Sequence, residues 1–347
     1  MILRFFTFIA LFFCIVSFNL SDVSAKENRK KVVVSFSILE DIVSVIGGKR
    51  VHVTSLVRRN MDLHMFQPTP RQAKIVSSAD LVIMNGLGLE GWMERLVKAS
   101  GYKGKTIVAT DNIPKLKFED DHDDHKKDDH GHKKDHDDHK KDDHGHKKDH
   151  DDHKKDDHGH KKDHDDHHGH GHGEWDPHVW LSVPNMKIYV TNVAEAMSRM
   201  DPSSKTYYMK NLKKYMSDLD NLDKFIRRSV NSIPKKDRVV ITSHEAFGHL
   251  SNEYGIEMLA PQGLSTETRA SASKIASIVR FIKKHSVKAV FPENITDNRL
   301  IEQIAKQTKI KIGASLYSDA LSEKNGPAGT YLNYMRYNVG TIVKALK

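Results

Sequence analysis

One internal segment of this 347-residue chain has nothing to contribute to a folded core. Every residue of 120–173 is aspartate, histidine, lysine or glycine, and 17 of these 54 residues are histidine. The motif HDDHKKDDHGHKKD occurs three times in succession, and a shortened fourth copy follows it. Because the segment offers no apolar side chain to bury, we expect it to be a disordered surface loop. The fold must therefore be built from the residues on either side of it.

The first 25 residues have the features of a secretory signal peptide. Arg4 provides the positive start, residues 5–20 are mainly apolar, and residues 23–25 offer small side chains for cleavage. A membrane anchor is the alternative, but the apolar run is short and contains polar residues. The single cysteine, Cys14, lies within this segment and does not follow a small residue, which argues against lipidation. Cleavage after Ala25 would leave no cysteine for disulfides or thiolate ligands.

Short apolar runs alternate with helical stretches on both sides of the 120–173 segment, which is the pattern of βα units and parallel sheets. The expected strands are Val32–Ser37, Val51–Val57, Leu81–Asn85, Thr106–Ala109, Val239–Ser243, Ile256–Ala260, Ala289–Pro292 and Ile310–Ala314. The expected helices are Ile38–Ile46, Pro70–Ser77, Glu90–Lys98, Asn185–Met200, His244–Tyr254, Ser271–His285, Asp297–Gln307 and Gly329–Leu346. The chain is thus predicted to be an α/β protein of two lobes, each with a four-stranded, mainly parallel sheet flanked by helices.

A long helix is expected between the two lobes. Residues Ser203–Ile233 contain neither glycine nor proline, and their apolar residues recur at spacings of three and four. This spacing places them in one stripe along a single helix of roughly 45 Å. An ordinary helix inside the second lobe remains the alternative. We therefore expect an N-terminal lobe over residues 26–200, a linking helix over 201–234 and a C-terminal lobe over 235–347.

Four polar residues follow expected strands or the 120–173 segment, where an open α/β fold builds its ligand sites. They are His64, His178, His244 and Asp319. Two come from each expected lobe, so their natural meeting place is a cleft between the lobes. Three neutral imidazoles and one carboxylate suit a tetrahedral Zn²⁺. These residues are spread over about 255 positions, so their spacing alone leaves open that each is a surface or hydrogen-bonded histidine.

The remaining histidines outside the 120–173 segment favour structural roles. His52 alternates with valines on a strand, and His285 lies beside lysines at a helix end. His244-Glu245-Ala246-Phe247-Gly248-His249 resembles a zinc-protease motif, but its histidines are five residues apart instead of four. On one helix their rings would point about 140° apart, which excludes protease chemistry from this motif.

The chain resembles the periplasmic zinc-binding proteins of bacterial ABC importers, within the wider group of zinc and manganese solute-binding proteins. The resemblance covers nearly all of the chain after residue 25. The motifs that carry it are His64 with Gln67-Pro68-Thr69-Pro70, Ala79-Asp80-Leu81, Asn85-Gly86-Leu87-Gly88-Leu89-Glu90-Gly91-Trp92, Asp176-Pro177-His178-Val179-Trp180-Leu181-Ser182, Ser243-His244-Glu245-Ala246-Phe247-Gly248, Leu264-Ser265-Thr266-Glu267 and Leu316-Tyr317-Ser318-Asp319.

This resemblance implies two α/β lobes joined by a rigid helix, with metal ligands at His64, His178, His244 and Asp319. Three histidines resemble the zinc group, whereas manganese binders usually place a carboxylate where His244 stands. A histidine-rich acidic loop before the Asp-Pro-His motif is also typical of the zinc group. Some zinc members carry a disulfide in the second lobe, which this chain cannot form.

We expect a protein that captures Zn²⁺ in the periplasm and delivers it to an inner-membrane ABC permease, acting as a monomer and not as an enzyme. Four protein ligands would leave no open position on the metal for an activated water. A manganese or iron importer protein is the alternative within the family, and a zinc hydrolase is the alternative outside it. Without residues 120–173 the chain carries a formal charge of +16, which could attract nucleic acid. An exported protein rarely meets nucleic acid, so we expect no such partner.

The histidines of the 120–173 segment are expected to bind Zn²⁺ weakly and to raise its concentration near the cleft. A tolerated repeat expansion with incidental binding, or a regulatory sensor, are the alternatives. These auxiliary residues are His122, His125, His130, His132, His136, His139, His144, His146, His150, His153, His158, His160, His164, His167, His168, His170 and His172.

Overall fold

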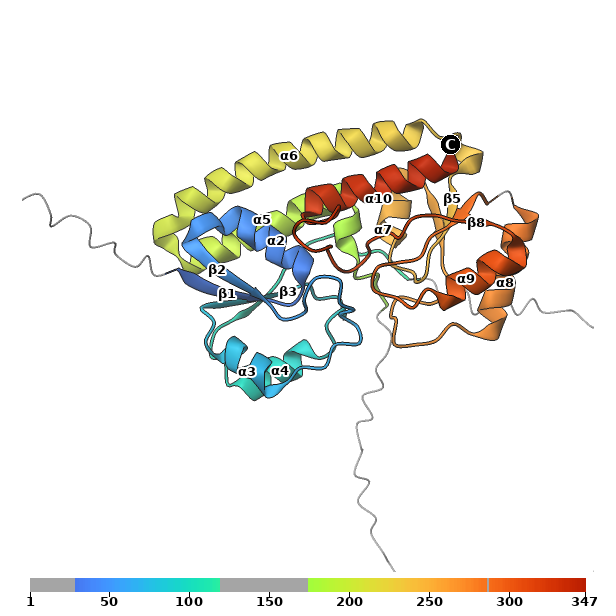
Figure 1. Cartoon of the computed structure of the whole chain (residues 1–347). Coiled ribbons are helices and arrows are strands. Elements are labelled where there is room, and N and C mark those ends of the chain that lie inside the picture. Colours follow the sequence, from blue (N-terminus) through green and yellow to red (C-terminus); the bar gives the residue numbers. More distant parts are fainter. Residues whose placement is uncertain (1–28, 119–173, 286) are drawn as a thin grey trace, which may run out of the picture. The chain divides into compact units, whose positions relative to one another are not determined.

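The computed structural model describes residues 29–118, 174–285 and 287–347 (Figure 1). The expected signal peptide over residues 1–25 lies outside the described residues, as does the histidine-rich segment 120–173, so both interpretations stay predictions. Within the described ranges, no helix combines the length and apolar character that crossing a bilayer requires.

Two four-stranded sheets, all of whose strands are parallel, form the framework. The first has the strand order β2-β1-β3-β4 and the second the order β6-β5-β7-β8. Their strands are β1 (Lys30–Val34), β2 (Val51–Ser55), β3 (Leu81–Met84), β4 (Thr106–Val108), β5 (Val239–Ile241), β6 (Glu257–Leu259), β7 (Ala289–Val290) and β8 (Lys311–Ile312). The expected fold class is thereby confirmed, and the two sheets have the same topology.

The strands are shorter than the apolar runs that predicted them. The run Ala289–Pro292, for example, forms a ladder only at its first two residues, in β7. Beyond the ladder, the amide of Phe291 donates to the carbonyl of Ile241, and the carbonyl of Pro292 accepts from the amide of Leu316. The apolar residues thus continue as buried backbone that leads into the loops at the carboxyl ends of the strands.

Helices surround both sheets (Figure 1). They are α2 (Ser37–Gly47), α3 (Pro70–Ser77), α4 (Met93–Ser100), α5 (Val183–Met200), α7 (Gly248–Tyr254), α8 (Ala272–Lys284), α9 (Arg299–Thr308) and α10 (Tyr331–Leu346), with short 3₁₀ turns at η1 (Gly48–Arg50), η2 (Val179–Leu181), η3 (Pro202–Ser204) and η4 (Lys235–Asp237). Local sequence sets several of these ends. Helix α3 begins at Pro70, where Thr69 and Gln72 cap each other reciprocally.

The long helix α6 (Lys205–Asn231) lies between the lobes in sequence and has 27 residues, or about 40 Å. It begins two residues later than predicted because residues 202–204 form a 3₁₀ turn. Its buried residues are the predicted stripe: Tyr208, Leu212, Tyr215, Leu219, Leu222 and Ile226, with Val230 beyond them. The helix packs against α2 and α5 beside the first sheet and against α10 and α7 beside the second.

Two predicted helix starts were wrong by three or more residues, and the others lie within two residues of the observed ones. Helix α7 begins at Gly248 and not at His244, because His244 forms a parallel bridge with Gln262 and the chain bends before it enters the helix. Helix α4 begins at Met93 and not at Glu90. The Glu90 side chain instead turns inward and accepts hydrogen bonds from the backbone of the preceding turn.

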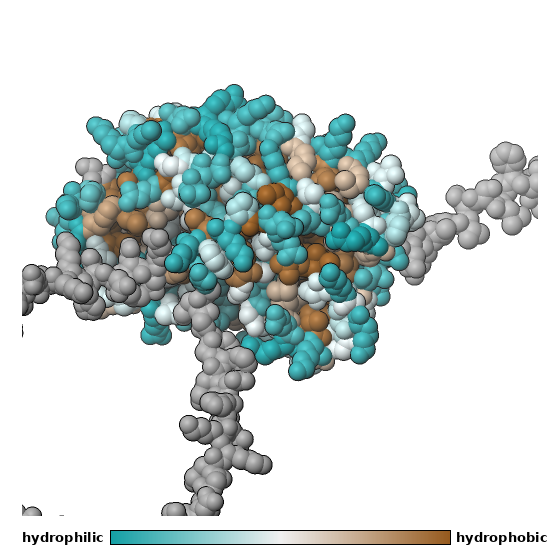
Figure 2. All heavy atoms as spheres, turned by 180° about the vertical axis from the view of Figure 1, so that it is seen from behind, coloured by the Kyte–Doolittle hydropathy of each residue, from teal (hydrophilic) through white to brown (hydrophobic). Residues whose placement is uncertain are grey.

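Most buried apolar side chains belong to one cluster that includes strand residues of both sheets, such as Val32 and Val240. A smaller cluster lies between α8, α9 and the second sheet. The face seen in Figure 2 is mostly hydrophilic. The large apolar residues exposed within the described ranges are separated in sequence: Val45, Met65, Met209 and Ile312. The polar residues of interest lie instead beyond the carboxyl ends of the strands.

Candidate metal centre

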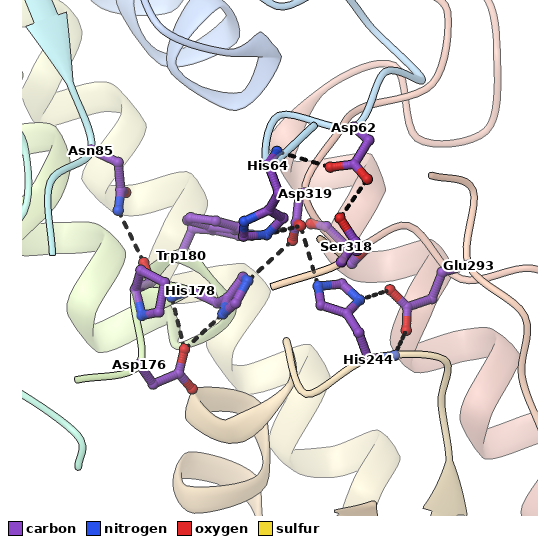
Figure 3. Close-up of polar contacts among 12 residues, drawn as sticks. Asp62, His64, Asn85, Asp176, His178, Trp180, His244, Glu293, Ser318 and Asp319 are labelled. Carbon is purple, nitrogen blue, oxygen red and sulfur yellow. Dashed lines mark hydrogen bonds and ion pairs between the residues drawn. The ribbon is translucent and has the colours of Figure 1, made fainter. Parts of the chain in front are cut away.

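The four candidate ligands come from loops at the carboxyl ends of strands and from the start of η2 (Figure 3). His64 follows β2, His244 follows β5 and Asp319 follows β8, while His178 directly precedes η2. Each contributes one potential ligand atom, and these four atoms all lie within 4.8 Å of one another. The structure therefore brings together all four residues that the sequence singled out.

Asp319 lies at the centre of the group. Its Oδ2 is 3.1 Å from Nε2 of His64 and 3.3 Å from Nε2 of His244, and its Oδ1 is 3.5 Å from Nε2 of His178. The three imidazole rings form a triangle with centroid separations of 5.5, 5.9 and 6.0 Å. All three histidines thus present Nε2 to the one carboxylate of Asp319.

Two buried carboxylates hold the other nitrogens of the inner histidines. Oδ1 of Asp176 lies 2.7 Å from Nδ1 of His178, and Oε2 of Glu293 lies 2.6 Å from Nδ1 of His244. A carboxylate at Nδ1 fixes the proton there and leaves Nε2 free as a ligand. Glu293 also accepts from the backbone amides of Ser243 and His244 through Oε1, at 2.8 and 2.9 Å.

Reasoning from the sequence missed Glu293 as a member of this centre. Its signal was present, because Glu293 follows β7 by three residues and so lies at the edge of the sheet that carries His244 and Asp319. Asp176 was noted only as part of a motif. Asp62 has a different role: its Oδ1 accepts from the amide of His64 at 2.8 Å, and its Oδ2 accepts from Oγ1 of Thr266 at 2.5 Å.

Burial makes the electrostatics of the centre strong. His178, His244 and Asp319 are fully buried, and only 9% of His64 is exposed. Burial opposes the charge on His244, but Glu293 and Asp319 outweigh it and raise the pKa of the imidazole well above its usual value. Burial likewise opposes ionisation of Asp319, yet His244 and His178 bring the pKa of its carboxyl well below its usual value.

The distances suit a small tetrahedral cation. Ligand atoms about 2.0–2.1 Å from Zn²⁺ would lie roughly 3.3 Å apart. Oδ2 of Asp319 lies at such distances from two histidines, 3.1 Å from His64 and 3.3 Å from His244, while His178 lies 3.5 Å from the other oxygen and the four ligand atoms together lie within 4.8 Å of one another. Nε2 of His178 and Oδ1 of Asp319 have no hydrogen-bond partner although both are buried. Buried polar atoms without partners are costly unless something else, such as a cation, satisfies them.

The other histidines among the described residues lie apart from this group. His52 and His285 are exposed as expected, with the ring of His285 stacked on Phe281 at 4.2 Å. His249 is buried, and its Nε2 lies 3.1 Å from the carbonyl oxygen of Asp176. The expected angle between His244 and His249 assumed one continuous helix, which the start of α7 at Gly248 rules out.

Comparison with known proteins identifies the family. The family model described as "ZnuA: Zinc-uptake complex component A periplasmic" matches residues 32–345. The manganese-binding lipoprotein MntA of Bacillus subtilis is 31% identical over 327 residues, which cover 92% of this chain and 91% of the relative. The manganese ABC transporter substrate-binding lipoprotein PsaA of Streptococcus mitis is 27% identical over 329 residues, covering 93% of this chain and 91% of the relative.

Solved structures agree with this assignment. The periplasmic zinc binding protein TroA from Treponema pallidum matches with a TM-score of 0.74 and 25% identity, covering 92% of this chain and 99% of TroA. A Mn-bound periplasmic metal binding protein from Candidatus Liberibacter asiaticus matches with a TM-score of 0.71 and 26% identity, covering 92% of this chain and 100% of the other. The chain therefore belongs to the ZnuA family of periplasmic metal-binding proteins of ABC transporters, which are substrate-binding proteins and not enzymes.

Proposed function

We propose that this chain captures Zn²⁺ between His64, His178, His244 and Asp319 and delivers it to an inner-membrane ABC permease. The observation that carries the proposal is the convergence of four ligand atoms within 4.8 Å in a buried site. We further propose that the chain is exported by residues 1–25 and acts in the periplasm as a monomer, without a nucleic-acid partner. Residues 26–200 and 235–347 would be its two lobes, and 201–234 the helix between them.

The ligand set supports capture and release instead of catalysis. Four protein ligands would fill a tetrahedral Zn²⁺ and leave no position for a reactive water. Three neutral imidazoles and one carboxylate would leave the centre at about +1, and the carboxylates of Asp176 and Glu293 lie close enough to offset that charge. Release would then require one pair of ligands to move away when the permease binds the protein.

The choice of zinc rests on the chemistry of the ligands. Imidazole nitrogens suit Zn²⁺, whereas Mn²⁺ prefers carboxylate, carbonyl and water oxygens. Manganese, or iron, remains the second candidate, and a specific finding favours manganese: the relative that is 31% identical is a manganese-binding lipoprotein. Competition between the two metals at the same site would decide between these candidates.

The auxiliary histidines of the 120–173 segment are proposed to gather Zn²⁺ with modest affinity. They lie outside the described residues, but the chain on either side of the segment is paired. Lys117 and Trp175 form an antiparallel bridge, and the amide of Phe118 donates to the carbonyl of Glu174 at 3.0 Å. A short turn could therefore replace the segment without separating its ends.

The test compares the full chain with a deletion of 120–173 and with His64→Ala in that deletion. Metal stoichiometry and competition against a chelator should show one tight Zn²⁺ in the deletion, lost with His64→Ala and not displaced by Mn²⁺. His52→Ala in the same background is the matched control, because His52 is an exposed histidine of the first sheet. A deletion that binds no Zn²⁺ tightly would make the 120–173 segment the main zinc binder. A deletion that prefers Mn²⁺ would support the second candidate.

A further inference from the structure

We propose that one turn, residues 85–92, positions both histidines that the first lobe contributes to the metal centre. This inference rests on the proposed function, because it takes His64 and His178 as metal ligands. The turn lies between β3 and α4. Its two end residues, Asn85 and Trp92, each donate a hydrogen bond to the carbonyl of the residue directly before one of these histidines.

Trp92 holds the chain on both sides of His64. Its Nε1 donates to the carbonyl of Leu63 at 3.1 Å, in a buried hydrogen bond. Its ring meets the ring of Phe66 edge-on, with the centroids 4.8 Å apart. Leu63 before His64 and Phe66 after it therefore both contact the indole of Trp92, which is only 6% exposed.

Asn85 holds the chain before His178 (Figure 3). Its Nδ2 donates to the carbonyl of Pro177 at 3.0 Å, and its Oδ1 accepts from the hydroxyl of Tyr189 at 3.1 Å. The hydroxyl of Tyr189 thus fixes which end of the amide faces Pro177. Pro177 has no backbone amide proton, so its carbonyl is the backbone polar group through which this residue can be anchored.

The turn between these two side chains is itself rigid. The carboxylate of Glu90 accepts from the amides of Asn85 and Gly86 at 2.7 and 3.0 Å, and from the hydroxyl of Ser35 at 2.6 Å. Gly86, Leu87 and Gly88 all have positive φ, and a Cβ at Gly86 would collide with the side chain of Val108. Glycine at this position is therefore required for the turn to form.

The turn 85–92 thereby fixes the orientation of two peptide groups, the one before His64 and the one before His178, although these ligands lie in separate loops. Metal centres lose affinity when the groups that orient their ligands are removed, even though those groups do not touch the metal. Asn85 and Trp92 are positioning residues in this sense. Their role explains the motif Asn85–Trp92, which contains no metal ligand.

The test uses Trp92→Phe and Asn85→Ala in the full chain. Trp92→Phe keeps an aromatic ring beside Phe66 and removes the donor to Leu63. The matched controls are Tyr208→Phe, which removes a hydroxyl that donates to Asp201, and Asn211→Ala, which removes an amide that donates to the carbonyl of Ile46. Both control bonds lie at α6, away from the metal centre.

Two measurements separate positioning from stability. The first is the affinity of the tightest Zn²⁺, measured against a chelator, which should fall about tenfold in each test variant. The second is the visible spectrum with sub-stoichiometric Co²⁺, so that only the tightest site fills. The test variants should shift this spectrum because the ligand geometry changes. Thermal unfolding of the metal-free proteins measures how much stability each variant loses, so that test and control variants can be compared at a similar loss.

The outcomes also distinguish this inference from the proposed function. If the test variants match the controls in Zn²⁺ affinity and Co²⁺ spectrum, while His64→Ala abolishes tight binding, the positioning role is wrong and the ligand assignment stands. If His64→Ala leaves tight binding unchanged, the proposed function itself fails, and the positioning role fails with it.

Discussion

Glu293 connects the backbone of the second lobe to the ring of His244. Both backbone amides at Ser243 and His244 donate to Oε1, so the other oxygen, Oε2, is the one that faces Nδ1 of His244. This ion pair favours a proton on Nδ1, and Nε2 on the other side of the ring lies 3.3 Å from Oδ2 of Asp319. The protein thus determines which nitrogen of His244 faces the metal with a residue that does not itself reach it.

We expect Glu293→Gln to lower Zn²⁺ affinity by about 10- to 100-fold. The two backbone amides require an oxygen at the Oε1 position, so the new amide nitrogen must face Nδ1 of His244. That nitrogen is a donor and would favour the tautomer with its proton on Nε2, which blocks the ligand atom. Chelator competition measures the change, with Glu323→Gln as the exposed control. Unchanged affinity would show that Glu293 does not set the tautomer.

The raised pKa of His244 predicts that metal binding releases a proton. A pKa raised in this direction favours a protonated imidazole in the metal-free protein, and Zn²⁺ must then displace that proton from Nε2. Affinity should therefore rise with pH through neutrality and fall as the solution becomes more acidic. Calorimetry in two buffers of different ionisation enthalpy should give close to one proton released per tight Zn²⁺. A release near zero at pH 7 would contradict a protonated His244 in the metal-free protein.

At the scale of helices and strands, the sequence was informative wherever periodicity and burial coincide. The stripe from Tyr208 to Ile226 predicted α6 almost to its ends, since every third or fourth residue is buried there. The start of α7 could not be predicted in the same way. The chain at 244–245 is held outside a helix because the amide of Glu245 donates to carbonyls of Gln262 and Gly263, and such pairing depends on a distant loop.

The sequence analysis predicted the ligands of the candidate site but not the groups that hold them. Asp319 and His244 were predicted because each is a polar residue that follows an expected strand. Glu293 accepts from backbone amides 49 and 50 residues away, and Trp92 donates to a carbonyl 29 residues away. Contacts of this kind leave no periodic pattern, because they depend on how loops from different strands meet.

Two neighbouring helices from opposite ends of the sequence, α2 and α10, are joined by a titratable contact. Asp41 in α2 accepts from the amide of Tyr331, the first residue of α10, at 2.8 Å. Burial raises the pKa of this carboxyl to about 6, although the bond from Tyr331 and the positive charge of Arg59 oppose the shift. The folded protein therefore holds a proton on Asp41 at pH values where the unfolded chain has lost it.

We expect Asp41→Asn to stabilise the metal-free protein at pH 8 and to have little effect below pH 4. Because the folded pKa is raised, the contribution of Asp41 is fully present below its usual pKa and is lost as the pH rises through about 6. The loss is at most about 3 kcal/mol, at about 1.4 kcal/mol per pH unit. Asparagine keeps an oxygen for Tyr331 and avoids the buried charge. Urea unfolding at both pH values measures the difference, and an equal effect at both would contradict the raised pKa.

At the scale of the whole described fold, the loop that carries His64 is bonded to the loops of the second sheet at several points. The amide of Asn60 donates to the carbonyl of Leu321, at 3.1 Å. Arg59 donates to the carbonyls of Ser322 and Gly329, at 2.9 and 2.8 Å. These bonds tie the loop of His64 to the segment that follows Asp319, so they must break before the two lobes can separate.

Thr266 makes a separate bond across the lobes, from the loop after β6 to Asp62 beside His64. We expect Thr266→Val to speed the dissociation of Zn²⁺ several-fold, because valine keeps the shape and removes the hydroxyl that holds Asp62. The bond from the His64 amide to Asp62 should survive, so the geometry of the bound metal should change little. Stopped-flow transfer of Zn²⁺ to a chelator measures the rate.

Thr308→Val is the matched control, because that hydroxyl donates within α9 to the carbonyl of Ile304, in a different part of the second lobe. A faster rate in Thr266→Val alone would mean that opening at the loop of Thr266 limits metal release. Equal rates in the two variants would place the limiting motion elsewhere. The bonds of Arg59 and Asn60 would then be the ones that hold the lobes closed.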